Sequence, residues 1–323
     1  MKAAVYHRYG PPDVVAIEEV PKPVPARDEV LVKVRATTVS SGDWRLRSAT
    51  VPRGFGLLVR LAAGITGPRK GVLGTELAGD VEAVGAGVTR FDVGDRVFAL
   101  TGAGLGAHAE YRSIRESAAL AHIPPKLTYE EAAALSFGGA TALYYLRDRT
   151  KVQSGERVLI NGASGAVGSA AVQLARHFGA VVTGVCSGAN ADLVRSLGAV
   201  QVIDHTERDF TKSAEVWDVI VDTVGNQSFA TCERVLAPGG RLGLASGDLG
   251  QTIGAMARPS RAGRSVFAGV SPERAEDLRV LAELAEAGAY KPVIDRIYPF
   301  DRIVDAHAHV ETRRKRGNVV ITL

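Results

Sequence analysis

The chain has 323 residues, of which 46% are apolar and 23% are charged, with a net charge of +4 at neutral pH and a pI near 9.1. This size and balance predict a folded protein of two domains. No apolar run reaches the length of a membrane span, and the first residues do not show the apolar segment of a signal peptide. Only two cysteines are present, which argues against a disulfide framework and favours a reducing, cytoplasmic location.

The first 125 residues are predicted to be rich in β-structure. Polar and apolar residues alternate over 29–39, as they do in a half-buried strand. The early prolines predict extended connections. Further strands are predicted over 76–88, 93–100 and 109–114. The glycine-bounded apolar stretch over 54–65 predicts either a short helix or a mobile flap.

From about Lys126 the pattern changes to alternating helices and strands. Thr128, followed by Glu130 and Glu131, is typical of a helix start. Apolar runs that predict strands then alternate with helical patterns, and the runs lie at 157–161, 181–186, 200–205, 217–225 and 239–246. Strands that are apolar throughout are buried on both faces, so this half predicts a doubly wound parallel sheet.

The last part of the chain combines two helical patterns with a final strand. Helices are predicted over 272–289 and 298–315, and a strand is predicted at the very end. An apolar terminal strand must pair, so we expect it to join the sheet of the first domain. The basic run at 313–317 fits the cationic last turn of a helix better than a nucleic-acid patch, because no aromatic residues accompany it.

The segment NGASGAVGSAA, after the strand at 157–161, contains glycines at three-residue steps. Set against the pattern G-x-G-x-x-G, its last two glycines are Gly165 and Gly168, and Ala163 takes the first place. The strand before and the helix after are the context that dinucleotide binding requires. Bare backbone lets a pyrophosphate approach the helix N-terminus, whereas close packing alone is the alternative explanation. The phosphate-binding residues predicted here are Ser164, Gly165, Ala166, Val167 and Gly168.

The residues after the second strand of this domain indicate which dinucleotide binds. NAD enzymes place a carboxylate there, on the ribose hydroxyls, but residues 186–190 contain none. Ser187 and Asn190 are polar groups that could face a 2′-phosphate, or they form a turn and a helix cap. His205, which ends the third strand, is predicted on the same edge. This pattern favours NADPH over NADH, with NADH as the alternative.

The chain resembles the medium-chain dehydrogenase/reductase superfamily, and within it the zinc-independent quinone oxidoreductase (zeta-crystallin-like) branch. The resemblance covers nearly the whole chain through ordered segments such as GTELAGDVEAVGAGVTRFDVGDRV, LTYEEAAALSFGGATALYYL, DVIVDTVG, PGGRL and RGNVVITL. It implies a GroES-like catalytic domain, residues 1–125 and 262–323, and a Rossmann nucleotide-binding domain, residues 126–261. It also implies a cofactor in the cleft between the domains, and a homodimer.

The chain departs from the zinc-dependent members of this superfamily at their ligand positions. Ser40 and Ser41 stand in VSSGDW, where those members carry a ligand, and their Gly-His-Glu motif reads Gly74-Thr75-Glu76 here. Tetrahedral zinc needs three or four converging ligands, so no metal site is predicted. A further departure is from the quinone reductases that the chain resembles, which often carry a Lys or Arg just after the second Rossmann strand and a Tyr at the place of His205. This chain has Ala189 or Asn190 after that strand, and Arg195, one turn along the helix, is a distant substitute.

The resemblance also implies residues that line the cleft. Ser40 is a candidate to bind the acceptor oxygen, with Asp43 and Trp44 beside it. Asp43 is equally explained as a helix N-terminal carboxylate and Trp44 by packing. Phe55, Leu57 and Leu58 are candidates to cover an apolar substrate or simply to bury a loop. The cofactor residues expected in addition to the glycine turn are Thr141 near the nicotinamide, Val224 and Asn318.

Without a metal to polarise a carbonyl, reduction of an activated acceptor is the favoured reaction. The sequence therefore predicts a zinc-independent, NADPH-dependent oxidoreductase that reduces small-molecule quinones or α,β-unsaturated carbonyls, with solvent or a bound water as the proton source. One alternative is a nucleotide-binding protein of this fold with a structural, sensing or RNA-binding role. Another is an alcohol or aldehyde dehydrogenase.

Overall fold

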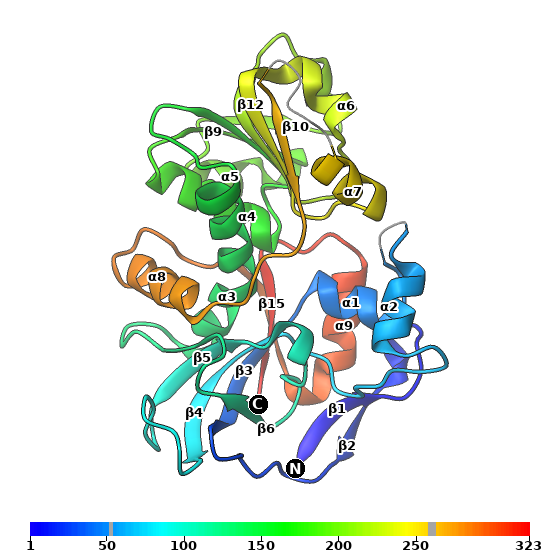
Figure 1. Ribbon diagram of the computed structural model, residues 1–323, viewed down its shortest axis with the longest axis vertical. Helices are drawn as coiled ribbons and strands as arrows, with labels where there is room; N and C mark the ends of the chain where they lie inside the picture. Colours follow the sequence, from blue (N-terminus) through cyan, green and yellow to red (C-terminus); the bar gives the residue numbers. More distant parts are fainter. Residues whose placement is uncertain (52–53, 258–262) are drawn as a thin grey trace. The chain divides into compact units, whose positions relative to one another are not determined.

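The computed structural model describes residues 1–51, 54–257 and 263–323, which form two compact units (Figure 1). We call the first the β-rich unit, and it contains Met1–Val51, Gly56–Phe137 and Glu273–Leu323. We call the second the parallel-sheet unit, and it contains Gly138–Pro272 together with Gly54 and Phe55. Each unit is described by itself below.

The described residues of the parallel-sheet unit form a six-stranded parallel sheet in the order β10-β9-β8-β11-β12-β13. The strands are β8 Arg157–Asn161, β9 Val181–Cys186, β10 Gln201–Asp204, β11 Trp217–Asp222, β12 Leu236–Leu244 and β13 Ser265–Ala268. In chain order this is 3-2-1-4-5-6, the doubly wound arrangement of dinucleotide-binding domains. The predicted fold of this half is therefore confirmed.

Helices cover both faces of the parallel sheet. They are α4 Ala166–His177, α5 Ala191–Ser196, α6 Phe229–Cys232 and α7 Leu249–Ala257. Figure 1 shows α4 and α5 on one face and α6 and α7 on the other, as right-handed crossovers on either side of β8 and β11 require. The central residues of β8, from Val158 to Ile160, are fully buried because both faces are covered.

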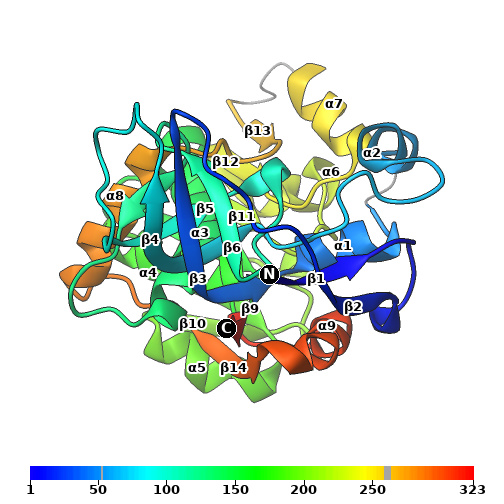
Figure 2. The ribbon, with the colours of Figure 1, turned by 90° about the horizontal axis from the view of Figure 1, so that it is seen from below.

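The β-rich unit is built on an essentially antiparallel sheet. Its seven described strands run β14-β15-β3-β4-β5-β7, with β6 also paired to β3, while β1 and β2 form a separate hairpin (Figure 2). The bounds are β1 Lys2–Tyr6, β2 Val15–Glu19, β3 Glu29–Val39, β4 Glu76–Val84, β5 Arg96–Leu100, β6 Tyr111–Arg115, β7 Leu120–His122, β14 Ile294–Pro299 and β15 Asn318–Thr322. The terminal strand β15 lies between β14 and β3, which confirms that the chain end returns to the first sheet.

Four helices of the described residues belong wholly to the β-rich unit, and a fifth leads out of it. They are α1 Ser41–Ser48, α2 Gly56–Ala63, α8 Ala275–Glu286 and α9 Ile303–Glu311, with α1 and α9 packed side by side (Figure 1). The helix α3, Tyr129–Leu143, continues into a π-helical turn over Tyr144–Arg149. Residues 54–65 thus contain a helix, as one of their two interpretations predicts. Nowhere in the described ranges is a helix long and apolar enough to cross a bilayer.

The two units divide at Phe137–Gly138 and Pro272–Glu273, whereas the sequence places the domain boundaries at 125–126 and 261–262. The first difference arises because α3 is one continuous helix whose two ends belong to different units. The second arises because β13 pairs with β12 in the parallel sheet. Neither α7 nor the short strand β13 was predicted from the sequence, so the second boundary was placed too early.

The basic run at 313–317 follows α9 instead of forming its last turn. The helix ends at Glu311, and Arg313 adopts a left-handed backbone conformation with φ of 58°. The guanidinium of Arg313 lies 4.5 Å from the centre of the Trp44 ring, and Arg316 lies 3.6 Å from Asp295. Arg313 and Arg316 thus make contacts within the β-rich unit, and the prediction that the run forms the last turn of a helix is wrong. That the run is not a nucleic-acid patch stays a prediction.

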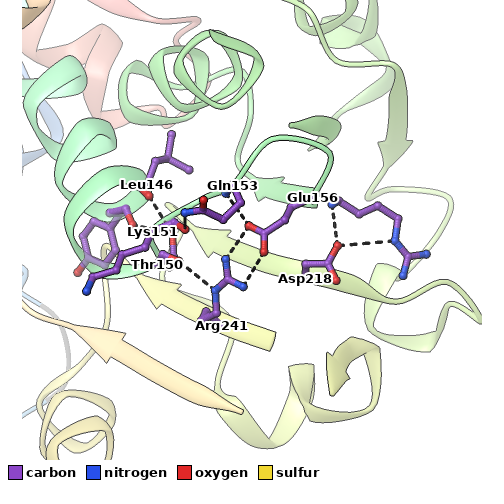
Figure 3. Close-up of polar contacts among 9 residues, drawn as sticks. Leu146, Thr150, Lys151, Gln153, Glu156, Asp218 and Arg241 are labelled. Atoms are coloured by element: carbon purple, nitrogen blue, oxygen red, sulfur yellow. Dashed lines mark hydrogen bonds and ion pairs between the residues drawn. The ribbon is translucent and has the colours of Figure 1, made fainter. Parts of the chain in front are cut away.

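A bidentate ion pair ties β12 to the turn that precedes β8 (Figure 3). Arg241 donates to the two carboxylate oxygens of Glu156 at 2.8 and 2.6 Å, and its Nε donates to the carbonyl of Thr150 at 2.9 Å. Burial raises the pKa of Glu156, but the hydrogen bonds from Arg241 and from the Gln153 N–H outweigh it and hold that pKa below its usual value. The pair therefore stabilises the sheet at neutral pH.

Candidate functional site

A glycine turn connects β8 to α4 at the carboxyl edge of the parallel sheet. Gly162 has a φ of +82°, which side chains disfavour, and α4 begins directly after Gly165. A Cβ on Gly168 would lie 2.0 Å from the carbonyl oxygen of Gly162. Gly168 is therefore required for packing of the helix against the turn, and Gly162 is required for the turn itself.

Gly165 differs from these two glycines because the protein leaves room beside it. Its backbone is extended, with φ of −79° and ψ of 176°, and among the described residues a Cβ there would meet only the Gly162 carbonyl, at 3.5 Å. Within the described part of the chain, no side chain caps the N-terminus of α4. The bare position thus forms a cradle that a Cβ would fill, next to uncapped N–H groups and the positive end of a twelve-residue helix. A pyrophosphate fits this arrangement.

The loops after β8 and β11 lie next to each other, at the point where the strand order reverses. A Cβ on Gly162 would come within 2.7 Å of both Thr223 and Val224. The carboxylate of Asp222, fully buried, accepts hydrogen bonds from the side chain of Asn161 at 2.9 Å and from the backbone N–H groups that follow it in the chain, those of residues 224, 225 and 227. Asp222 thereby fixes the loop that presents Val224, whose side chain is 48% exposed.

Three of the predicted cofactor residues meet at the ends of β8 and β9. The amide of Asn190 donates to the hydroxyl oxygens of Ser164 and Ser187, in both cases at 3.2 Å. His205, in contrast, is exposed, and its backbone N–H bonds to the carbonyl of Cys186. Arg195 is bound to Asp192 at 2.9 Å, so in this structure its charge is already paired.

A carboxylate that the sequence reasoning overlooked lies beside this group. Asp204 ends β10, where its backbone is level with Cys186 of β9. One of its oxygens accepts from the backbone and hydroxyl of Thr206 at 2.9 and 2.7 Å. The other carboxylate oxygen lies next to Gly188, because a Cβ added to that glycine would be only 2.4 Å from it. The sheet thus brings an acid from the third strand to the loop that follows the second, whereas the sequence pattern directs attention to the end of the second strand alone.

Ser40, Asp43 and Trp44 lie at the start of α1 in the β-rich unit. Ser40 caps the helix: its hydroxyl accepts from the N–H groups of Gly42 and Asp43 and donates to the Asp43 carboxylate at 2.6 Å. The other oxygen of Asp43 accepts from the N–H of Gly74 at 2.9 Å. Trp44 packs in the core of this unit, with its indole N–H unpartnered among the described residues. The geometry therefore gives Asp43 a structural task, one of the two roles that the sequence allows.

The remaining predicted residues are more scattered. Thr141 is almost buried on α3. Asn318 is buried at the start of β15, where its amide donates to the carbonyl of Val293 at 3.1 Å. Leu57 is 71% exposed on α2 and Phe55 is half-buried, whereas the side chain of Leu58 lies outside the described part of the chain.

A buried carboxyl near Asp43 is a second group that sequence reasoning did not identify. Glu76 accepts hydrogen bonds from the hydroxyl of Thr38 and, at 2.8 Å, from the N–H of Phe137. Only 1% of its surface is exposed, and burial raises its pKa to about 7. Burial also lowers the pKa of the nearby Lys315 to about 8. The described residues contain no group of three or more His, Cys, Asp or Glu side chains placed to hold a metal.

Comparison with known proteins gives consistent matches along the chain. Family models for the alcohol dehydrogenase GroES-like domain and for zinc-binding dehydrogenases match residues 26–125 and 197–321. A 2-methylene-furan-3-one reductase of Solanum lycopersicum is 34% identical over 99% of this chain and 79% of its own. A quinone oxidoreductase of Pseudomonas aeruginosa is 32% identical over 99% of both chains. The solved structure of the quinone oxidoreductase from Coxiella burnetii superposes with a TM-score of 0.88, at 27% identity, over 100% of this chain and 99% of that one.

Proposed function

Because this chain belongs to the quinone oxidoreductase branch of the medium-chain dehydrogenase/reductase superfamily, and is thus an oxidoreductase, we propose that it reduces quinones or α,β-unsaturated carbonyls with NADPH and without zinc. The observation that carries the proposal is the open position at Gly165, at the carboxyl edge of a sheet with dinucleotide-binding strand order. The names of the relatives, a furanone reductase and quinone oxidoreductases, supply the acceptor class.

The roles of the chain's own residues follow from their positions. A bound reduced nicotinamide supplies the hydride. The backbone from Gly165 to Gly168 binds the pyrophosphate, and Ser164, Ser187 and Asn190 face the adenosine ribose. Asp222 is a positioning residue, because it holds the loop that carries Val224 through its hydrogen bonds to that loop's backbone. Zinc independence rests on Ser40 and Thr75 at the family's ligand positions, since neither hydroxyl is a preferred zinc ligand.

Ser40 is proposed to bind the acceptor oxygen, for which its proton must turn away from Asp43. We expect Ser40→Ala to lower turnover about tenfold, the worth of one hydrogen bond in the transition state, and to change nucleotide affinity less than twofold. Loss of the helix cap should also cost about 1 kcal/mol of stability. Steady-state kinetics, nucleotide titration and denaturant unfolding measure the three effects.

The variant Ser40→Thr separates the two roles, because threonine retains both the hydroxyl and the capping oxygen. It should restore stability and most of the turnover. Wild-type turnover in Ser40→Ala would remove Ser40 from the acceptor site.

The activity itself is tested by following NADPH oxidation with a panel of quinones, enones and saturated aldehydes, with and without a metal chelator. We expect oxidation with quinones or enones, little with saturated aldehydes, and the same rate after chelation. NADH is run in parallel. Activity confined to alcohols or aldehydes, or abolished by the chelator, would contradict the proposal.

Two finer points belong to the same proposal. Cys186 and Cys232 are buried free thiols, which suits the reducing cytoplasm that we propose as the location.

We also propose a homodimer, by resemblance to the family. Sedimentation of the purified protein measures its mass in solution and tests this proposal.

A further inference from the structure

The loop after β9 is held by a carboxylate from the neighbouring strand. Asp204 lies at the end of β10, beside the end of β9. One of its carboxylate oxygens accepts hydrogen bonds from Thr206, and the other is directed at Gly188. Gly188 lies in the segment 187–190, whose Ser187 and Asn190 are linked to the glycine turn through Ser164. The acid therefore belongs to the same cluster of loop ends as the proposed ribose-facing residues.

Asp204 carries a full negative charge at neutral pH. The hydrogen bonds from the backbone and side chain of Thr206 lower the pKa of its carboxyl, and the Gly188 N–H adds to this effect. Arg195 does not offset this charge, because it is paired with Asp192, whereas the exposed His205 attracts the carboxylate in its charged form. A 2′-phosphate brings close to two further negative charges, so it meets repulsion that a 2′-hydroxyl does not.

We infer that Asp204 limits the preference for NADPH: its carboxylate acts against the 2′-phosphate and keeps NADH usable as an alternative hydride donor. This inference rests on the proposed function, in which the ribose lies at this edge. It gives a site without an acid after its second strand a means to discriminate between the two nucleotides. The residue that does so comes from the third strand.

The test is the substitution Asp204→Asn, with the dissociation constants of NADPH and NADH measured by fluorescence titration. Asparagine can still accept from Thr206 but has no charge. We expect NADPH to bind about tenfold tighter, as removal of one nearby like charge predicts, and NADH affinity to change less than twofold. Unchanged affinity for NADPH, or an equal change for both nucleotides, would overturn the inference.

Two further variants separate charge from loop geometry. Asp209→Asn is the matched control, because Asp209 accepts the same two hydrogen bonds from Thr211 and pairs with Lys212 instead of reaching Gly188; it should leave the ratio of the two dissociation constants unchanged. Asp204→Glu keeps the charge and should also keep the ratio, whereas a ratio shifted as in Asp204→Asn would overturn the role of charge. Failure of the wild-type protein to bind either nucleotide would instead contradict the proposed function.

Discussion

Replacing Gly165 with alanine is expected to weaken the binding of both NADPH and NADH at least tenfold while leaving the stability of the fold almost unchanged. Of the atoms that the structure describes, the added Cβ meets one, the Gly162 carbonyl oxygen, at an ordinary contact distance of 3.5 Å. It does, however, occupy the space through which a pyrophosphate would approach the N–H groups of α4. Loss of a single hydrogen bond to a charged group costs about 1.5–3 kcal/mol, which corresponds to at least a tenfold change in affinity.

The same substitution three residues later should fail in the opposite way. A Cβ on Gly168 would lie 2.0 Å from the carbonyl oxygen of Gly162 and 2.9 Å from the Cα of Ala163. These are backbone atoms, so no rotamer change relieves the overlap, and α4 must move away from the turn. We expect Gly168→Ala to lower the free energy of unfolding by about 3 kcal/mol, as overpacking of a well-packed core does.

Denaturant unfolding and nucleotide titration of the two alanine variants check both expectations. Each variant is the control for the other, since the chemical change is identical and the positions lie within one turn. If Gly165→Ala binds nucleotide as tightly as the wild-type protein, the pyrophosphate does not lie at this turn. If Gly168→Ala is as stable as Gly165→Ala, the packing role of Gly168 is wrong.

The parallel-sheet unit was the more predictable half of the chain, for a physical reason. Strands buried on both faces are continuous apolar runs, and short crossovers place consecutive strands beside each other. The predicted ranges for β8 and β9 coincide with the observed strands. Because carboxyl ends of parallel strands share one edge, Ser164, Ser187 and Asn190, each predicted to bind the cofactor, lie together, and hydrogen bonds join them.

What the sequence did not predict depends on contacts between distant segments. The β1–β2 hairpin pairs residues across a proline-containing loop, and the predicted helix over 298–315 is in fact the end of β14 followed by α9. The strand β14 forms because β15 offers a partner edge, and nothing local indicates it. Asp204 was overlooked for the same reason, since its nearness to Gly188 arises from the pairing of β10 with β9.

Glu76 is a further residue whose behaviour depends on its tertiary environment, because its burial makes the stability of the protein depend on pH. Between pH 4.5 and pH 7 we expect the stability of the wild-type protein to fall by about 3 kcal/mol relative to that of Glu76→Gln. Burial raises the pKa of the folded-state carboxyl from 4.5 to about 7. A pKa that differs by one between the folded and unfolded states corresponds to about 1.4 kcal/mol of stability.

The sign follows from where the proton is held. The folded state binds the proton of Glu76 more tightly than the unfolded state does, so its contribution is complete below pH 4.5 and is lost as the pH rises through about 7. The neighbouring groups oppose one another: the charge of Asp43 raises this pKa, whereas Lys315 and the hydrogen bonds from Thr38 and Phe137 lower it. Tyr290, buried in the same region, has a pKa raised by burial and stays neutral.

Glutamine is the appropriate replacement because it resembles the protonated acid. Its carbonyl oxygen can accept from the Phe137 N–H, and its amide can donate to the Thr38 hydroxyl, so both contacts survive without the charge. Urea unfolding of both proteins at several pH values up to 7 measures the difference. This range stays below the pKa of Lys315, which is about 8.

The control is Glu82→Gln, the same substitution on the same strand, β4. Glu82 is exposed, and its hydrogen bond from Lys22 lowers its pKa, so it is ionised in both states over most of this range and should contribute almost no slope. A Glu76→Gln difference as flat as that of Glu82→Gln would mean that Glu76 titrates normally. A carboxyl so deeply buried would then have to be ionised through its attraction to Lys315, and the Lys315→Met variant would restore the slope.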